Sequence, residues 1–416
     1  MSKLQIRNFG PIKNGFNNNG NHKIDIKKVT IFIGNQGSGK SSVAKLFSTL
    51  SWIEKALVRG NIDSKDLTTY KRFQKKYCAY QNIHNYFRKN TFIEYEGEAY
   101  ILTYQNETFK IIEKQDKSKY LLPKIMYVPA ERNFVSAVSQ PEKLKYLPQT
   151  LFTFLDEYQR SIEEIESNIK LPINNLTFKF DKKRNVTKLV GNDYELLLTE
   201  ASSGLQSLVP LFVVSKNLAE GINHETDFTK NKSNLEEIQN IRKRLQDIIS
   251  NDKLPENLKI QAINLIAEIY NNDCFINVVE EPEQNLYPTS QKEILSSLIE
   301  YNNLNQGNEL VITTHSPYLI NYLTLSIKAN EIYNNLINSN TQEKHDLIKK
   351  EINSIVSLKS LVNKNDFAIY QLSDEGDIRL LETLNGLPSD ENYLNQNLAE
   401  LNYLFTDLLE IEYKWK

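Results

Sequence analysis

The residues with the most specific chemistry in this chain lie at positions 34–41, which read GNQGSGKS. They complete the pattern G-x-x-x-x-G-K-[ST], in which backbone N–H groups wrap a phosphate chain, the lysine balances the β- and γ-phosphate charge and the last hydroxyl reaches Mg²⁺. The alternative, a turn rich in glycine and serine before a helix, does not account for the whole pattern. The nucleotide-binding residues that the pattern predicts are Gly34, Asn35, Gln36, Gly37, Ser38, Gly39, Lys40, Ser41 and Ser42.

Two adjacent carboxylates form the second chemical feature. Glu280 and Glu281 end an apolar run at 274–279. In a phosphohydrolase, one carboxylate at such a place holds the water shell of Mg²⁺ and its neighbour polarises the attacking water. The alternative is an acidic turn that caps the following helix, and the apolar residues before the pair argue against it.

Two weaker features depend on this context. His315 follows a predicted strand at 309–313, so its imidazole could reach the γ-phosphate of a nucleotide that Lys40 binds, although an isolated histidine is more often structural. Ser202, Ser203 and Gly204 stand before a predicted helix, where N–H groups and hydroxyls can bind an anion. A plain serine cap of that helix is the alternative.

Strands and helices at matching places must position these groups. An apolar run at 29–33 precedes the phosphate-binding pattern, and apolar residues at helical spacing follow it, so we expect a strand, a loop and a helix. Similar runs at 124–128, 274–279 and 309–313 predict buried strands whose ends carry the candidate polar groups. The alternating start of the chain predicts an edge of the same sheet.

The remaining pattern divides the chain. We predict one α/β unit over 1–416, with a nucleotide-binding core at 1–60 and 270–416, an insertion at 60–130 and a helical lobe at 131–270. The other predicted elements are a β-meander at 92–114, a helix at 145–168, strands at 176–180 and 194–198 around a charged turn, a polar loop at 222–234, a helix at 290–301, a hairpin at 367–381 and an amphipathic helix from Leu394 to Leu408.

Composition narrows the function classes. The 416 residues exceed the size at which one core stops growing. A net charge of -2 gives the whole chain no general attraction for nucleic acid. Local basic clusters at 71–76, with interleaved aromatic residues, at 182–184 and at 242–244 could still follow phosphates, so nucleic acid stays a candidate partner.

Cysteine usage and hydropathy bear on location. Cys78 and Cys274 form neither a disulfide framework nor a metal set, which fits a reducing cytosol. No run approaches the ~18 apolar residues that a membrane-spanning helix requires. We therefore predict a cytoplasmic protein without a membrane partner.

The order of these motifs resembles the ABC-class ATPases, an AAA-family group that includes the SMC, RecF and OLD-like proteins. In that class a Walker A loop, a glutamine-type loop, a signature motif, Walker B with a catalytic acid, a D-loop and a switch histidine follow one another. The residues that carry the resemblance are Gly34 to Ser41, Glu131, Ser202 to Gln206, Glu280 to Glu283, Gln284 to Pro288 and Thr314 to Pro317. The resemblance implies an α/β fold, an ABC-type P-loop ATPase head with a mixed sheet core, a β-meander subdomain and a helical lobe.

The resemblance also implies roles, with ATP and Mg²⁺ as cofactors. Glu281 would activate water and His315 would sense the γ-phosphate. Mg²⁺ would be held by Ser41 and Glu280, with Glu131 as a further candidate. In a head-to-tail homo-oligomer, the residues that close over the nucleotide of a second subunit would be Ser202, Ser203, Gly204 and Gln206.

Three departures from the class pattern matter. Glu280 stands where many relatives have aspartate, so its reach to Mg²⁺ is longer by one methylene. The signature reads SSGLQ instead of LSGGQ, which points away from membrane transport. Glu131 replaces the usual glutamine, and a pairing with Arg132 at a lobe junction is the structural alternative.

Within the class, the segments PAERN and EEPE are similar to the ATPase subunits of the bacterial antiphage systems PARIS and Septu. That similarity implies a sensor or scaffold subunit that works with a separate effector such as a nuclease. A RecF- or SMC-like DNA maintenance ATPase and a nucleotide-gated scaffold with little turnover are the alternatives. ATP-dependent DNA binding would favour the former, and ATP binding without turnover the latter.

Overall fold

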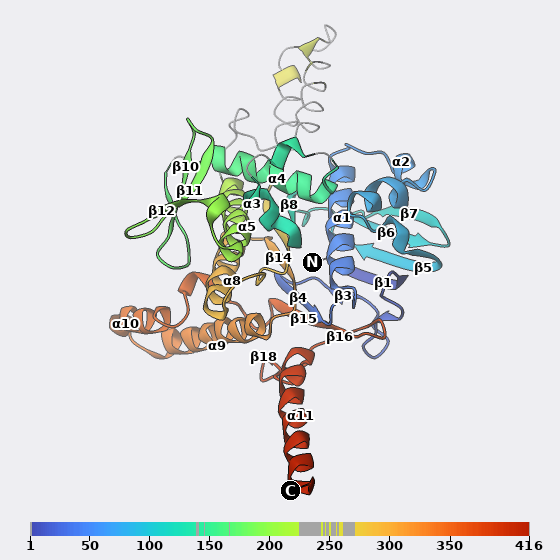
Figure 1. Cartoon of the computed structure of the whole chain (residues 1–416). Helices are drawn as coiled ribbons and strands as arrows, with labels where there is room; N and C mark the ends of the chain where they lie inside the picture. The colour runs from blue at the N-terminus through green and yellow to red at the C-terminus, as the bar shows by residue number, and fades with distance from the viewer. Residues whose placement is uncertain are drawn as a thin grey trace.

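The computed structural model describes residues 2–138, 141–144, 146–165, 167–223 and 271–415, together with isolated positions between 243 and 260. Figure 1 shows a body of sheets and helices from which α11 (Tyr393–Trp415) projects at the C-terminal end. Most of the predicted loop at 222–234 lies outside the described residues. Within them, no helix is long and apolar enough to cross a membrane.

A seven-stranded mixed sheet forms the centre of the molecule, in the order β2-β16-β15-β4-β14-β13-β8. Its strands are β2 (Gly15–Phe16), β4 (Val29–Gly34), β8 (Pro123–Val128), β13 (Cys274–Glu280), β14 (Glu309–Thr314), β15 (Phe367–Leu372) and β16 (Asp377–Leu380). The five strands from β15 to β8 run parallel, so their carboxyl ends meet at one edge. Every residue of β4 and β13 is buried, which explains why these strands are mostly apolar. The predicted mixed sheet core is confirmed.

Helix α1 (Lys40–Val58) separates the central sheet from a five-stranded antiparallel sheet, in the order β3-β1-β5-β6-β7. Its strands are β1 (Lys3–Phe9), β3 (Ile24–Asp25), β5 (Phe87–Glu96), β6 (Tyr100–Gln105) and β7 (Thr108–Glu113). The predicted β-meander is confirmed. The start of the chain is a correction, because β1 pairs with β5 and not with the central sheet. Leu4 and Ile6 on β1 are fully buried in the same apolar cluster as Phe47 of α1.

The predicted helical lobe contains a second small sheet. Helices α3 (Phe134–Ala137), α4 (Gln149–Glu163) and α5 (Ser203–Glu220) share a core with strands β9 (Ile169–Lys170), β10 (Thr177–Asp181), β11 (Val186–Val190) and β12 (Glu195–Leu197). The charged turn joins β10 to β11, a strand that the sequence pattern does not predict. Thr187 and Lys188 interrupt its apolar residues, so its pattern is weak.

The C-terminal third completes the central sheet and adds helices. They are α8 (Pro288–Asn302), α9 (Pro317–Ser339) and α10 (Gln342–Asn353), and a two-stranded sheet of β17 (Thr383–Leu384) and β18 (Leu387–Pro388) follows. Pro288 and Pro317 occupy the first turns of their helices, where a missing N–H costs nothing. The predicted hairpin is confirmed as β15 and β16.

One predicted basic cluster has a different role. It lies around α2 (Ser64–Thr68) and a π-helical turn at Phe73–Cys78. Phe73 is 1% exposed and stacks on Phe109 with ring centroids 4.3 Å apart, so it is a core residue and not a stacking platform for bases. Lys71 pairs with Glu107 at 3.0 Å. Arg242 and Arg244 of another cluster lie outside the described residues.

Candidate nucleotide-binding site

The predicted phosphate-binding loop joins β4 to α1, as the sequence pattern indicates. Gly34, Gly37 and Gly39 have φ angles of 147°, 80° and 105°, which side chains rarely adopt. A Cβ on Gly34 would also lie 2.3 Å from the carbonyl oxygen of Leu372 on β15. Only glycine therefore fits at this position. Gln36 and Gly37 are exposed at the tip, whereas Ser41 and Ser42 lie in the first turn of α1.

Lys40 folds back onto its own loop. Its Nζ donates hydrogen bonds to the carbonyl oxygens of Gly34, at 2.9 Å, and Asn35, at 2.8 Å. Burial lowers the pKa of Lys40 to about 8, against the opposing effect of Glu281 and other nearby carboxylates. The buried hydroxyl of Ser38, in the same loop, has no hydrogen-bond partner. The loop therefore holds a buried cation and an unused hydroxyl where the motif places phosphate.

The carboxylate pair lies at the end of β13, one strand from the end of β14. Glu280 is 5% exposed, and its Oε1 has no hydrogen-bond partner. Glu281 has a φ of 44° and donates its N–H to the carbonyl oxygen of Thr313 at 2.8 Å. Burial, and then the charge of Glu280, raises the pKa of Glu281. A carboxylate with a raised pKa next to Lys40 is suited to accept a proton from water.

Glu283 has a role that the sequence did not reveal. Its Oε1 accepts hydrogen bonds from the N–H of His315 and the hydroxyl of Thr314, both at 2.8 Å. This fixes the turn after β14, and the Nε2 of His315 then lies 3.5 Å from Oε1 of Glu281. Burial, and then the charge of Lys40, lowers the pKa of His315, which keeps the imidazole neutral near pH 7. Glu283 is thus engaged in positioning His315, which leaves Glu281 as the better candidate base.

Arg132 is the largest fully buried side chain of the site. It follows β8 and donates to the carbonyl oxygens of Glu280 and Glu281, each at 2.6 Å, and to that of Ser207 in α5 at 3.2 Å. The sequence left open a pairing of Arg132 with Glu131. The hydrogen bonds described for the Arg132 guanidinium instead go to backbone carbonyl oxygens. Burial lowers the pKa of Arg132 to about 10. The guanidinium thus joins the carboxylate turn to the helix that begins at Ser203.

Parts of this chain match known proteins. Residues 276–321 match the family described as "AAA domain, putative AbiEii toxin, Type IV TA system". Endonuclease GajA of Bacillus cereus (strain HuB5-5) is 25% identical over 199 residues, which cover 43% of this chain and 26% of the endonuclease. The matched part is therefore a minor share of that relative. These findings support an ABC-class ATPase of the SMC and OLD group.

Solved structures of ABC-class ATPases are also similar in outline. The SMC head domain from Thermotoga maritima has a TM-score of 0.34 and 10% identity, over 77% of this chain and 90% of that one. A dimeric ATP-binding cassette in a post-hydrolysis state, bound to ADP and Pi, has a TM-score of 0.29 and 12% identity, over 92% of this chain and 100% of that one. The fold class rests on the sheet order and the P-loop context described above.

In an ABC-class ATPase the signature motif stands apart from the P-loop of its own chain. Ser202 and Ser203 are exposed at the start of α5, and the Ser202 side chain does not cap that helix. In the described part of the chain, no hydrogen bond joins 202–204 to 34–41, and Figure 1 shows α5 and α1 apart. Gln206 is buried and donates to the carbonyl oxygens of Leu198 and Thr199, so it braces its own loop.

Gly204 packs against the segment that follows the carboxylates. A Cβ at this position would lie 2.6 Å from the carbonyl oxygen of Asn285. Gly204 is therefore required for a contact within the chain, whatever it contacts in a second copy. Glu131 is exposed in a 3-10 turn, Ala130–Asn133, and its predicted role in metal binding stays a prediction.

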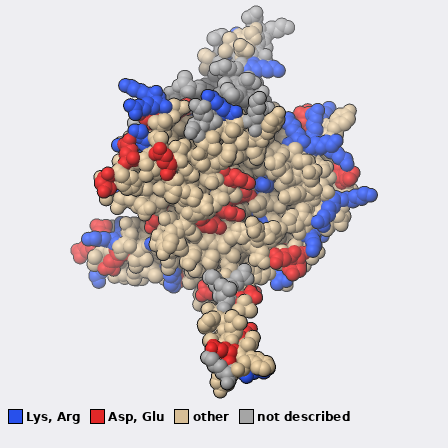
Figure 2. Space-filling view, in the orientation of Figure 1, with Lys and Arg blue, Asp and Glu red and all other residues tan. Residues whose placement is uncertain are grey.

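The charge distribution fits ATP with Mg²⁺. Figure 2 shows Asp and Glu side chains gathered in the middle of one face, beside a small basic area. The carboxylates that surround Lys40 would repel a free polyphosphate, so we expect ATP to bind there together with a divalent cation. Mg²⁺ binds through one or two carboxylates plus phosphate oxygens, and the unpartnered Oε1 of Glu280 is a suitable ligand. The hydroxyl of Ser41 would be the second protein ligand.

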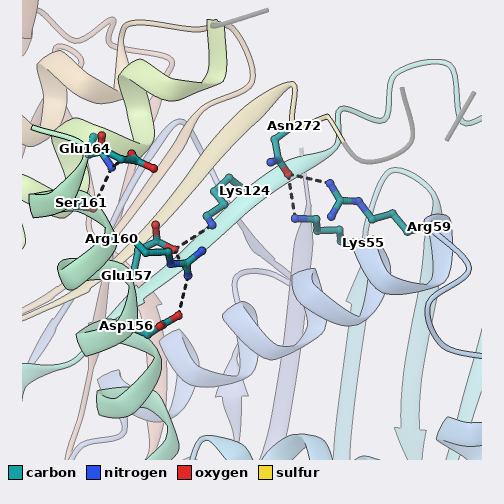
Figure 3. Close-up of polar contacts among 10 residues, drawn as sticks. Lys55, Arg59, Lys124, Asp156, Glu157, Arg160, Ser161, Glu164 and Asn272 are labelled. Carbon is teal, nitrogen blue, oxygen red and sulfur yellow. Dashed lines mark hydrogen bonds and ion pairs between the residues drawn. The ribbon is translucent and has the colours of Figure 1, made fainter. Parts of the chain in front are cut away.

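The opposite, amino-terminal edge of the sheet also carries charged side chains, and these form contacts within the chain, although Oε1 of Glu157 has no hydrogen-bond partner. Figure 3 shows Glu157 of α4 between Lys124 of β8 and Arg160, with both ion pairs at 3.1 Å. At the end of α1, Lys55 and Arg59 both donate to the side-chain oxygen of Asn272, at 3.0 and 3.1 Å. These contacts join the helices to the strands and lie away from the P-loop.

Proposed function

We propose that this chain binds ATP with Mg²⁺ at the carboxyl edge of the central sheet and hydrolyses it between two protomers that pack head to tail. The observation that carries the proposal is the convergence of Lys40, Glu281 and His315 from β4, β13 and β14, which are neighbouring parallel strands. Its general outline, an ATPase with ABC-type architecture, has the support of the family match.

The chain's own residues suggest how hydrolysis proceeds. Lys40 exchanges its bonds to the carbonyls of Gly34 and Asn35 for bonds to the β- and γ-phosphate oxygens. Glu281 accepts a proton from the attacking water, whose oxygen bonds to the γ-phosphorus as the bond to ADP breaks. Neutral His315 contacts the γ-phosphate and reports its presence. Mg²⁺, when bound, neutralises charge on the phosphates.

Ser203 is the better probe of the trans contact. Gly204 is packed against Asn285, so a substitution there would disturb its own chain, whereas Ser203 is exposed. We expect Lys40→Ala and Ser203→Arg to be inactive when each is alone. Mixed in equal amounts, they should regain about a quarter of the parent rate, because half of the dimers are mixed and each has one intact composite site.

This complementation is measured as ATP turnover of the two purified variants, alone and mixed. Lys216→Ala, at the far end of the same helix α5, is the matched control and should hydrolyse ATP like the parent. A mixture no more active than the mean of its components would contradict the head-to-tail arrangement.

We further propose that the output of the cycle lies in a separate effector within a bacterial defence system. The support is the toxin–antitoxin description of the matched family and the similarity to an endonuclease over part of its length. The purified chain should hydrolyse ATP without cutting DNA or RNA, and co-expression with the neighbouring gene should yield a stable complex. Metal-dependent nuclease activity of the single chain that survives every ATPase-site substitution would contradict this.

A further inference from the structure

The C-terminal half of α11 presents an apolar surface to solvent. Every residue from 402 to 415 is exposed, and Figure 1 shows this part of the helix extending away from the body. The large apolar side chains there include Leu404, Leu408, Ile411 and Trp415, which are 53%, 64%, 56% and 80% exposed. An isolated helix of this length is marginal in water, and a surface this apolar calls for a partner.

The spacing of these four residues indicates what kind of partner fits. Leu404, Leu408, Ile411 and Trp415 follow one another at steps of four, three and four residues, and we call them the seam. This is the a/d spacing of a coiled coil, which places one stripe of side chains against another helix. Asp407 and Lys414 lie one heptad apart on the same edge of the stripe, so each flanks the seam.

We propose that the seam of α11 pairs, antiparallel, with the seam of a second copy of this chain. In this register Leu404 packs against Trp415 of the second copy, and Leu408 against its Ile411. Asp407 then faces Lys414 of the second copy, and by the twofold symmetry this opposite-charge pair occurs twice. Parallel pairing would instead bring Asp407 near Glu412 of the second copy, acid against acid. The charges therefore select an antiparallel second copy.

The register also suits the rest of the molecule. Only the projecting half of each helix takes part, so the two bodies lie at opposite ends of the pair. No residue of the nucleotide site is involved. This interface is separate from the proposed ATP-dependent sandwich and should form without nucleotide, so either one can fail while the other stands.

Sedimentation equilibrium of the full chain without nucleotide tests the proposal over a concentration series. The parent and Lys40→Ala should both self-associate. Leu408→Asp places a carboxylate in the seam and should abolish association, whereas Glu410→Gln, on the opposite face of the helix, should not change it. Circular dichroism of each variant checks that the body is folded. A parent that stays monomeric throughout the series would overturn the proposal.

A charge exchange separates pairing with a copy from every other role of this helix. Asp407→Lys and Lys414→Asp each put like charges in apposition twice, and each should raise the dimer dissociation constant about tenfold. The double variant restores two opposite-charge pairs and should recover the parent's constant. Failure of the double variant to recover would overturn the antiparallel register, since only a second copy carries the compensating change.

Discussion

The two edges of the central sheet carry the same residue types in different states of pairing. At the amino edge Glu157 lies between Lys124 and Arg160, and two cations of α1 share Asn272 (Figure 3). At the carboxyl edge Glu280 has a buried oxygen without a partner, and the hydrogen bonds described for Lys40 go to its own loop. Oε1 of Glu157 is also without a hydrogen-bond partner, but Glu157 forms ion pairs with two cations of its own chain. No described ion pair joins Lys40 to a carboxylate, so the carboxyl edge is the one whose charges are left for a ligand.

The difference between the two edges indicates which charged residues serve stability and which serve function. Charges that hold α1 and α4 to the strands find partners in the same chain, and their loss should reduce stability. In the proposed function, charges at the carboxyl edge would gain their partners from nucleotide and Mg²⁺, so their loss should reduce binding or turnover and leave the fold intact. Matched substitutions at the two edges separate these outcomes.

The largest contrast should come from the two lysines. Lys40→Ala should abolish ATP binding while the protein stays folded, because Lys40 is the cation that the motif places at the β- and γ-phosphates. Lys124→Met should bind ATP like the parent but lose about 2 kcal/mol of unfolding free energy, because it breaks a largely buried pair with Glu157. Titration calorimetry measures the affinity for ATP, and urea unfolding measures the unfolding free energy. Equal ATP affinity in Lys40→Ala and the parent would remove the contrast.

Arg132 should combine both kinds of effect. Arg132→Met leaves the carbonyls of Glu280, Glu281 and Ser207 without their donor, which should cost about 3 kcal/mol of unfolding free energy. Because the same bonds hold the carboxylate turn, kcat should fall more than KM rises. Arg132→Lys keeps one donor group, so its stability and kcat should lie between those of the parent and those of Arg132→Met. A variant with parent-like kcat would show that this clamp has no part in catalysis.

The smallest effect should be a change in the pH dependence of stability. Glu54 of α1 is buried and accepts hydrogen bonds from the Tyr95 hydroxyl, at 2.8 Å, and from the N–H groups of Ala99 and Tyr100, at 2.7 and 3.0 Å. Burial nevertheless raises its pKa. Because the pKa of Glu54 is raised in the folded protein, protonated Glu54 stabilises the folded state. This stabilisation is fully present below the ordinary pKa of a glutamate and is lost as the pH rises through the raised pKa of the folded protein.

Glu54→Gln removes that titration. Thermal unfolding followed from about pH 4 upward should give a flatter pH profile for the variant than for the parent. Glu391→Gln is a control, because this carboxylate is exposed. Parallel profiles for Glu54→Gln and the parent would mean that Glu54 does not contribute to the pH dependence.

The sequence predicted the parts of the site that lie within single motifs. The P-loop, the carboxylate pair and His315 each follow an apolar run, and parallel pairing then brings them to one edge. The contacts of Arg132 and Glu283 were not predicted. Arg132 donates to backbone carbonyls and Glu283 accepts from the turn at Thr314 and His315, and only folding brings these groups together. Gln206 was assigned to a second subunit by resemblance, yet its amide braces Leu198 and Thr199. Strand β11 was missed because polar residues interrupt its pattern.

The central claim is that the carboxyl edge of the sheet hydrolyses ATP with Glu281 as the base. Steady-state ATP turnover of Glu281→Gln, with ATP affinity measured on the same sample, tests it most directly. Glu157→Gln, at the amino edge, is the matched control and should keep the parent's kcat. The account predicts parent-like ATP binding for Glu281→Gln with a loss of at least ~10²-fold in kcat. Turnover within a few-fold of the parent would contradict it.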